Sequence, residues 1–273
     1  MNKPFFLIAA LLSLQAMAHD PTPTPITAGL QSRSYDLHEP ASPIAVVIDM
    51  HGGLGSANFR WSVSDPSLLT FSDDEAVVMA FPDGSGSGSL LTWNAGTCCG
   101  YAETNNIDDI EFLDALVVEL KADYPGLPIY MGGHSNGGQM AYRYLCEGSE
   151  AIDGLYSVSG VTAIASCAAQ AIPVLHRHGV DDTNSPPLGG QTTGPSNEIH
   201  QSVRDSMDNV NSNRTSCCHD IVTSGLEVVE TWDCNADMTV RFISDDPGTP
   251  SVDEGDHAWV DGTLGILWTE FGF

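Results

Sequence analysis

The sequence predicts an α/β fold in which a mostly parallel sheet is covered by helices on both faces. Three features lead to this prediction. Apolar runs rich in β-branched residues, such as Ile44–Met50, are typical of strands buried on both faces of a parallel sheet. They alternate with segments whose apolar residues recur at helical spacing, such as 107–120. The stretch Leu127–Gly138 adds a short apolar strand that runs directly into Gly-x-Ser-x-Gly and then into a helix.

The N-terminal segment Met1–Ala18 has the features of a secretory signal peptide. It contains a lone Lys3, an apolar run over Phe5–Leu14 and a small-x-small pattern at Ala16-Met17-Ala18. We therefore expect residues 1–18 to be removed and the protein to be secreted. Residues 19–273 show no linker and no internal repeat, so a single domain is the expectation.

Composition excludes two classes of partner. The chain has 36 acidic and 9 basic residues, which gives a formal net charge of −27. Such a field repels nucleic acid, so we expect no nucleic-acid partner. Beyond the N-terminal segment, no stretch reaches the ~20 apolar residues that a membrane span requires, so we expect no membrane partner.

The other elements follow in chain order. Weak alternation predicts an edge hairpin over Ile26–His38. Further strands are expected at Ala76–Phe81, Gly154–Gly160, Pro173–Gly179, Gly225–Trp232 and Met238–Ile243. Helices are expected over 107–120, Gly138–Cys146 and Leu264–Phe271. Asp108 and Asp109 lie in the first turn of the helix over 107–120, where the helix dipole favours negative charge. We therefore interpret them as helix-start residues rather than as catalytic ones.

Ser135 is the predicted nucleophile. A sharp turn around it crowds the residues two positions before and after, and Gly133 and Gly137 stand at those positions without a Cβ to clash. The following helix directs its N-terminus, including the N–H of Asn136, at a developing oxyanion. A second donor is expected near Gly53, after the strand that ends in His51-Gly52-Gly53, with an ordinary glycine turn as the lesser alternative.

The acid and the base are predicted from chain order. A serine nucleophile needs a base within hydrogen-bond reach, and the base needs an orienting carboxylate, in the order Ser, acid, His. The loop after Pro173–Gly179 offers Asp181 and Asp182. His257 is the expected base, because it follows the last strand, whereas His200 falls in a probable helix and His219 precedes that strand.

Longer motifs resemble a known family. The matching residues are His51-Gly52, Trp93-Asn94-Ala95-Gly96-x-Cys98-Cys99-Gly100, Asp108-Asp109-x-x-Phe112, Gly133-His134-Ser135-Asn136-Gly137-Gly138, His178-Gly179-x-x-Asp182 and Gly255-x-His257-x-Trp259. The chain resembles the secreted esterases grouped with polyhydroxybutyrate depolymerases and with the feruloyl and acetylxylan esterases of carbohydrate-esterase family one. That family places the acid three residues after His-Gly, which selects Asp182. Val180 and Val260 stand where the family usually has Thr and Pro. Both flank the predicted catalytic loops, so they affect loop shape and substrate fit more than the chemistry.

The resemblance implies an α/β-hydrolase fold over residues 19–273 and a serine esterase that uses no cofactor and no metal. We expect plant-cell-wall esters of the feruloyl or acetyl-xylan type as substrates, with a polyhydroxyalkanoate depolymerase as the alternative. Trp93, Trp259 and His134 are the candidate substrate-binding residues, although both tryptophans could be core. A catalytically silent fold that binds carbohydrate or polymer is the alternative from another class.

Seven cysteines remain after residue 18, and in an exported chain they favour disulfides over metal ligands. The sequence contains no C-x-x-C pair, so we expect no zinc site. We expect Cys234 to be bridged to Cys217 or Cys218, closing a loop of roughly 15 residues beside the last strand, as the resemblance also implies. Cys98 or Cys99 is expected to be tied to the helix or strand behind Ser135.

Overall fold

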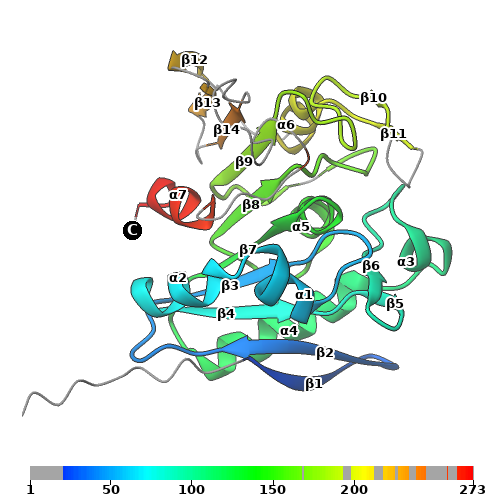
Figure 1. Cartoon of the computed structure of the whole chain (residues 1–273), viewed down its shortest axis with the longest axis vertical. Helices are drawn as coiled ribbons and strands as arrows, with labels where there is room; N and C mark the ends of the chain where they lie inside the picture. The colour runs from blue at the N-terminus through cyan, green and yellow to red at the C-terminus, as the bar shows by residue number, and fades with distance from the viewer. Residues whose placement is uncertain are drawn as a thin grey trace, which may run out of the picture.

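A computed structural model of the chain describes residues 21–167, 169–192, 198–211, 218–224, 227–233, 238–243, 257 and 263–272. The predicted signal peptide lies outside these residues. Within them, one sheet has ten strands (Figure 1). In spatial order these are β1 (Thr22–Ala28), β2 (Gln31–His38), β4 (Val77–Pro82), β3 (Ala45–Met50), β7 (Ile129–His134), β8 (Gly154–Val158), β9 (Val174–Gly179), β14 (Met238–Ile243), β13 (Glu227–Asp233) and β12 (Cys218–Ser224).

The six central strands, from β4 to β14, run parallel. Antiparallel strands flank them at both ends, where β1 and β2 form the predicted edge hairpin and β12 and β13 form a second one. Every residue of β3, β4, β8 and β9 is buried, including the polar Asp49 of β3 and the His176, Arg177 and His178 of β9. Burial on both faces is typical of central strands in a parallel sheet.

Helices cover both faces of the sheet. The helices are α1 (Ala57–Phe59), α2 (Ser67–Glu75), α3 (Gly100–Thr104), α4 (Asp109–Asp123), α5 (Asn136–Glu147), α6 (Val203–Asn211) and α7 (Thr263–Glu270), with one π-helical turn, η1 (Arg60–Ser64), after α1. One core joins alternate residues of the strands to α4, α5 and α6. The other core joins the intervening residues to α1, α2 and α7. The predicted α/β architecture is therefore confirmed.

Two small antiparallel pairs lie outside the main sheet. They are β5 (Ser85–Ser87) with β6 (Leu90–Thr92), and β10 (Gly190–Gln191) with β11 (Ile199–His200). Among the described residues, no helix is long and apolar enough to cross a membrane.

The carboxyl ends of the parallel strands meet at one edge of the sheet. Met50 pairs with Gly133 and His134 with Val158, so the loops after β3, β7 and β8 start side by side. Gly179 pairs with Ile243 at the ends of β9 and β14. Ligand sites of open α/β sheets form at this edge, which is where the predicted nucleophile and acid lie.

The structure contains two disulfides within the described residues. Cys146, near the end of α5, is bonded to Cys167, and Cys98 is bonded to its neighbour Cys99. The expectation that Cys98 or Cys99 is tied to the helix or strand behind Ser135 is therefore wrong, because it is Cys146 that links this helix to the loop beyond β8. Cys217 and Cys234 lie outside the described residues, and of Cys218 only the backbone position at the start of β12 is described.

Candidate active site

Ser135 occupies the sharp turn between β7 and α5. Its φ and ψ are 53° and −119°, and a positive φ is rare for a residue with a side chain. A Cβ built on Gly133 or on Gly137 would overlap the carbonyl oxygen of Met50. The two glycines therefore let the turn pack against the end of β3, as the motif predicted.

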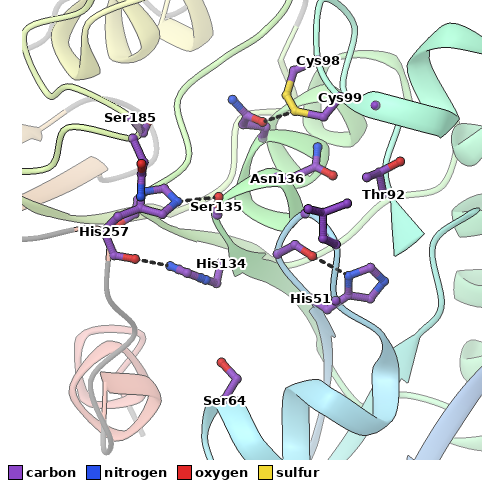
Figure 2. Close-up of a pocket in the computed structure, with 18 of the residues that line it drawn as sticks. His51, Ser64, Thr92, Cys98, Cys99, His134, Ser135, Asn136, Ser185 and His257 are labelled. Atoms are coloured by element: carbon purple, nitrogen blue, oxygen red, sulfur yellow. Dashed lines mark hydrogen bonds between the residues drawn. A yellow bond between two sulfur atoms is a disulfide. The ribbon is translucent and has the colours of Figure 1, made fainter. Parts of the chain in front are cut away.

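The structure brings the predicted nucleophile, base and acid into one hydrogen-bonded line. Nε2 of His257 lies 2.6 Å from Oγ of Ser135, and Nδ1 of His257 lies 2.7 Å from Oδ2 of Asp182. Figure 2 shows the ring of His257 directed at Ser135, with a dashed line between them. The neighbouring Asp181 is exposed, so the loop after β9 presents only Asp182 to His257.

Asp182 is buried and receives several hydrogen bonds. Its Oδ1 accepts the N–H groups of Asn184 at 2.8 Å and Ser185 at 2.7 Å. Its Oδ2 lies 3.2 Å from Nε2 of His178, in addition to its contact with His257. Burial raises the pKa of Asp182, but the hydrogen bonds from His178 and His257 outweigh it and hold this pKa well below its usual range. The carboxyl is therefore ionised at neutral pH.

The two predicted oxyanion donors lie at the same cavity as Ser135. Asn136 is the first residue of α5, where backbone N–H groups have no partner within the helix. Its side chain is occupied elsewhere, because Oδ1 accepts the N–H of Trp93 at 2.7 Å and Nδ2 donates to the carbonyl oxygen of Trp93 at 3.1 Å. A Cβ on Gly53 would lie 3.6 Å from Cβ of Asn136, so the two segments are in contact.

The cavity has a volume of about 560 Å³. No Asp or Glu is among its described lining residues, although the chain has 36 acidic residues. Leu54 and Phe59 line it and are 53% and 48% exposed, which makes part of its mouth apolar.

The predicted substrate-binding residues are placed differently from one another. Trp93 is fully buried, stacks on Phe112 with ring centroids 6.4 Å apart, and does not line the cavity. Its assignment as a substrate-binding residue is therefore wrong, and its backbone instead holds the side chain of Asn136. Trp259 lies outside the described residues.

His134 lines the cavity and supports the base. Burial lowers its pKa to about 3, so it is neutral at neutral pH. Its Nε2–H donates to the carbonyl oxygen of His257 at 3.1 Å, which fixes the position of that residue (Figure 2).

Two features of the cavity wall were not predicted. The Cys98–Cys99 disulfide lines it, and so does His200, which belongs to β11 rather than to a helix.

The two Sγ atoms of Cys98 and Cys99 and a carboxylate oxygen of Glu198 lie within 4.8 Å of one another. Because both sulfurs are held in the disulfide, this group cannot supply the thiolates that a metal ion would need.

No protein-family model matches the sequence, and no curated protein matches it either. Solved structures do match. An acetyl xylan esterase from Aspergillus awamori superposes with a TM-score of 0.60 and 14% identity, over 92% of this chain and 100% of that chain. The chain has an α/β-hydrolase fold. TT1662 from Thermus thermophilus gives a TM-score of 0.56 and 15% identity over 92% and 96% of the two chains. Native sOPH superposes with a TM-score of 0.51 and 15% identity, over 72% of this chain and 77% of that chain.

Proposed function

We propose that this α/β-hydrolase-fold protein is a serine carboxylic-ester hydrolase. The observation that carries the proposal is the line from Oδ2 of Asp182 through His257 to Oγ of Ser135, at 2.7 and 2.6 Å, in the wall of a cavity. A serine hydroxyl is a weak nucleophile unless a base accepts its proton during attack. His257 is placed to be that base, and Asp182 keeps the proton on Nδ1 so that Nε2 faces the serine.

Acylation follows from this arrangement. Oγ of Ser135 attacks the carbonyl carbon of the ester while its proton passes to Nε2 of His257. The carbonyl oxygen becomes an oxyanion that accepts hydrogen bonds from the N–H groups of Gly53 and Asn136. The intermediate then collapses, the bond to the alcohol oxygen breaks, and the leaving alcohol takes the proton from His257.

Deacylation repeats the same steps with water. His257 takes a proton from a water molecule that attacks the acyl carbon, and then returns it to Oγ of Ser135 as the carboxylic acid leaves. His257 carries a positive charge in both transition states, and the ionised Asp182 stabilises that charge. The reaction uses no cofactor.

The substrates we propose are neutral plant-cell-wall esters of the feruloyl or acetyl-xylan type. Cavities of several hundred Å³ hold ligands of drug size, so about 560 Å³ accommodates an aromatic or short acyl group. The fold similarity to an acetyl xylan esterase and the sequence resemblance to carbohydrate-esterase family one both support this choice. A polyester such as polyhydroxybutyrate is the second candidate, favoured by the exposed Leu54 and Phe59 at the cavity.

We further propose that the protein acts outside the cytoplasm. The signal-peptide pattern of residues 1–18 supports export. The Cys146–Cys167 disulfide supports it independently, because structural disulfides persist in oxidising compartments.

Hydrolysis of p-nitrophenyl acetate by the wild type and by Ser135→Ala and His257→Ala tests the proposal. We expect each variant to lose roughly four to six orders of magnitude in kcat with little change in Tm. Full activity of either variant would remove the mechanism, and an inactive wild type that still binds xylan would favour the carbohydrate-binding alternative. Methyl ferulate, acetylated xylan and polyhydroxybutyrate, compared by kcat/KM, then separate the substrate classes.

A further inference from the structure

Two buried histidines lie behind the acid of the candidate site. His176 and His178 are two residues apart on β9, so their side chains leave the same face of the strand. Both are 1% exposed, their rings are nearly parallel, and neither lines the cavity. Nε2 of His176 lies 2.9 Å from Nδ1 of His178, and Nδ1 of His176 lies 2.8 Å from the hydroxyl of the buried Tyr142 on α5.

The far end of this chain of contacts reaches Asp182. Nε2 of His178 lies 2.6 Å from the carbonyl oxygen of Ser185 and 3.2 Å from Oδ2 of Asp182. A carbonyl and a carboxylate only accept hydrogen bonds, so Nε2 of His178 carries a proton.

The contact between Tyr142 and His176 determines the direction in which each hydrogen bond is donated. Within the described residues, the hydroxyl of Tyr142 meets Nδ1 of His176 as its hydrogen-bond partner, so its proton is donated there. Nδ1 of His176 is then an acceptor, and its Nε2–H donates to Nδ1 of His178. Nδ1 of His178 is therefore the acceptor at that contact, and each proton in this series of contacts points toward the carbonyl of Ser185 and the carboxylate of Asp182.

We propose that His178 is a positioning residue for Asp182, and that Tyr142 and His176 fix the tautomer in which it donates. This inference rests on the proposed function, in which Asp182 orients His257. Oδ1 of Asp182 is held by two backbone N–H groups, and His178 contacts Oδ2, the same oxygen that contacts His257. The carboxylate thereby keeps one orientation while His257 gains and loses its charge.

Burial supports the need for such a donor. It disfavours the ionised carboxyl of Asp182, and the hydrogen bond from His178 is the strongest influence that lowers this pKa again. Burial also lowers the pKa of His176 well below its usual value, which agrees with the neutral ring that the geometry requires.

The direct test compares His178→Phe, which removes the donor but keeps a flat ring, with His178→Gln, which keeps an N–H donor of similar reach. On p-nitrophenyl acetate we expect His178→Phe to lower kcat by about tenfold or more, since a hydrogen bond to a charged group is lost. KM should stay close to the wild-type value, and His178→Gln should recover most of kcat. Wild-type kcat in His178→Phe would overturn the proposal.

A second pair of variants decides the matter if His178→Phe fails to fold. Tyr142→Phe removes one hydroxyl that contacts neither Asp182 nor the cavity, and it should lower kcat by a few fold because His176 can then take either tautomer. Tyr144→Phe is the matched control: Tyr144 is also buried on α5, but its hydroxyl donates to Asp114 at 2.9 Å. We expect wild-type kcat for this control. Equal kcat in the two variants would overturn the inference, whereas full activity of Ser135→Ala would instead overturn the proposed function.

Discussion

Nδ1 of His51 lies 2.7 Å from the carbonyl oxygen of Gly52. Nε2 of His51 accepts the N–H of Gly84 at 3.0 Å, so the ring proton is on Nδ1 and is donated to Gly52. A peptide unit is planar, and the unit that contains this carbonyl also contains the N–H of Gly53. His51 therefore helps to set the direction of one proposed oxyanion donor.

The first prediction concerns this contact. Replacing His51 with Ala removes one of the two hydrogen bonds on the Gly52 carbonyl, the other coming from the N–H of Gly55 at 3.1 Å. We expect kcat to fall by about tenfold, toward the ~10²-fold that loss of a whole oxyanion donor produces. His51→Asn should fall less, because its amide N–H can replace Nδ1–H. Kinetics on p-nitrophenyl acetate, with Tm measured alongside, check this. Unchanged kcat in His51→Ala would show that the peptide is held without the ring.

The second prediction distinguishes the two neighbouring aspartates. In Asp182→Asn, the amide oxygen would remain on the N–H groups of Asn184 and Ser185, so the NH2 group would face the Nδ1–H of His257. We expect kcat to fall by roughly three to four orders of magnitude, as in other enzymes whose base is forced into the wrong tautomer. The exposed Asp181 provides the control, and Asp181→Asn should keep its activity. A large loss in that control would mean that the acid has been assigned one residue too late.

Much of this arrangement is local and could be predicted from the sequence. The strand β3 is apolar except for Asp49, and the turn at Ser135 is encoded by the glycines on either side of it. The acid and base follow from chain order once this turn is placed, because the carboxyl ends of parallel strands share one edge.

What could not be predicted depends on contacts between distant segments. Trp93 begins a motif that the sequence associates with the site, but only its stacking on Phe112 in the structure shows that it belongs to the core. His200 precedes α6 by three residues, and helix boundaries are the least certain part of a sequence-based assignment. The contact of Tyr142 with His176 joins residues 34 positions apart, and neither belongs to a recognisable motif.

The third prediction is a loss of stability on mild acidification. Burial lowers the pKa of His51 to about 4 and that of His134 to about 3, and it lowers the pKa of His176 as well. The unfolded chain binds protons at these residues below about pH 6.5, whereas the folded chain does not, so the free energy of unfolding decreases as the pH falls. We expect about 2 kcal/mol less stability per histidine at pH 5.

Tm measured between pH 7 and pH 5 at constant ionic strength checks this third prediction. Carboxyl groups of ordinary pKa stay ionised down to about pH 5, so their titration contributes little over this range. Burial raises the pKa of Asp49 and Asp109, and protonation of these two carboxyl groups in the folded chain offsets part of the loss. The same Tm at both pH values would contradict the prediction.

The fourth prediction is that salt raises the Tm. With a net charge of −27, like-charge repulsion opposes folding, and its range shrinks from ~30 Å at 0.01 M to ~8 Å at 0.15 M ionic strength. Screening also weakens exposed pairs such as Lys121 with Glu150, but each is worth only about 0–1 kcal/mol, and 9 basic residues can form few of them. Tm at pH 7 should therefore increase with NaCl and equally with KCl, because screening depends on ionic strength rather than on the cation. A Tm that is constant or falls with either salt would show that the acidic side chains are too far apart to repel one another appreciably.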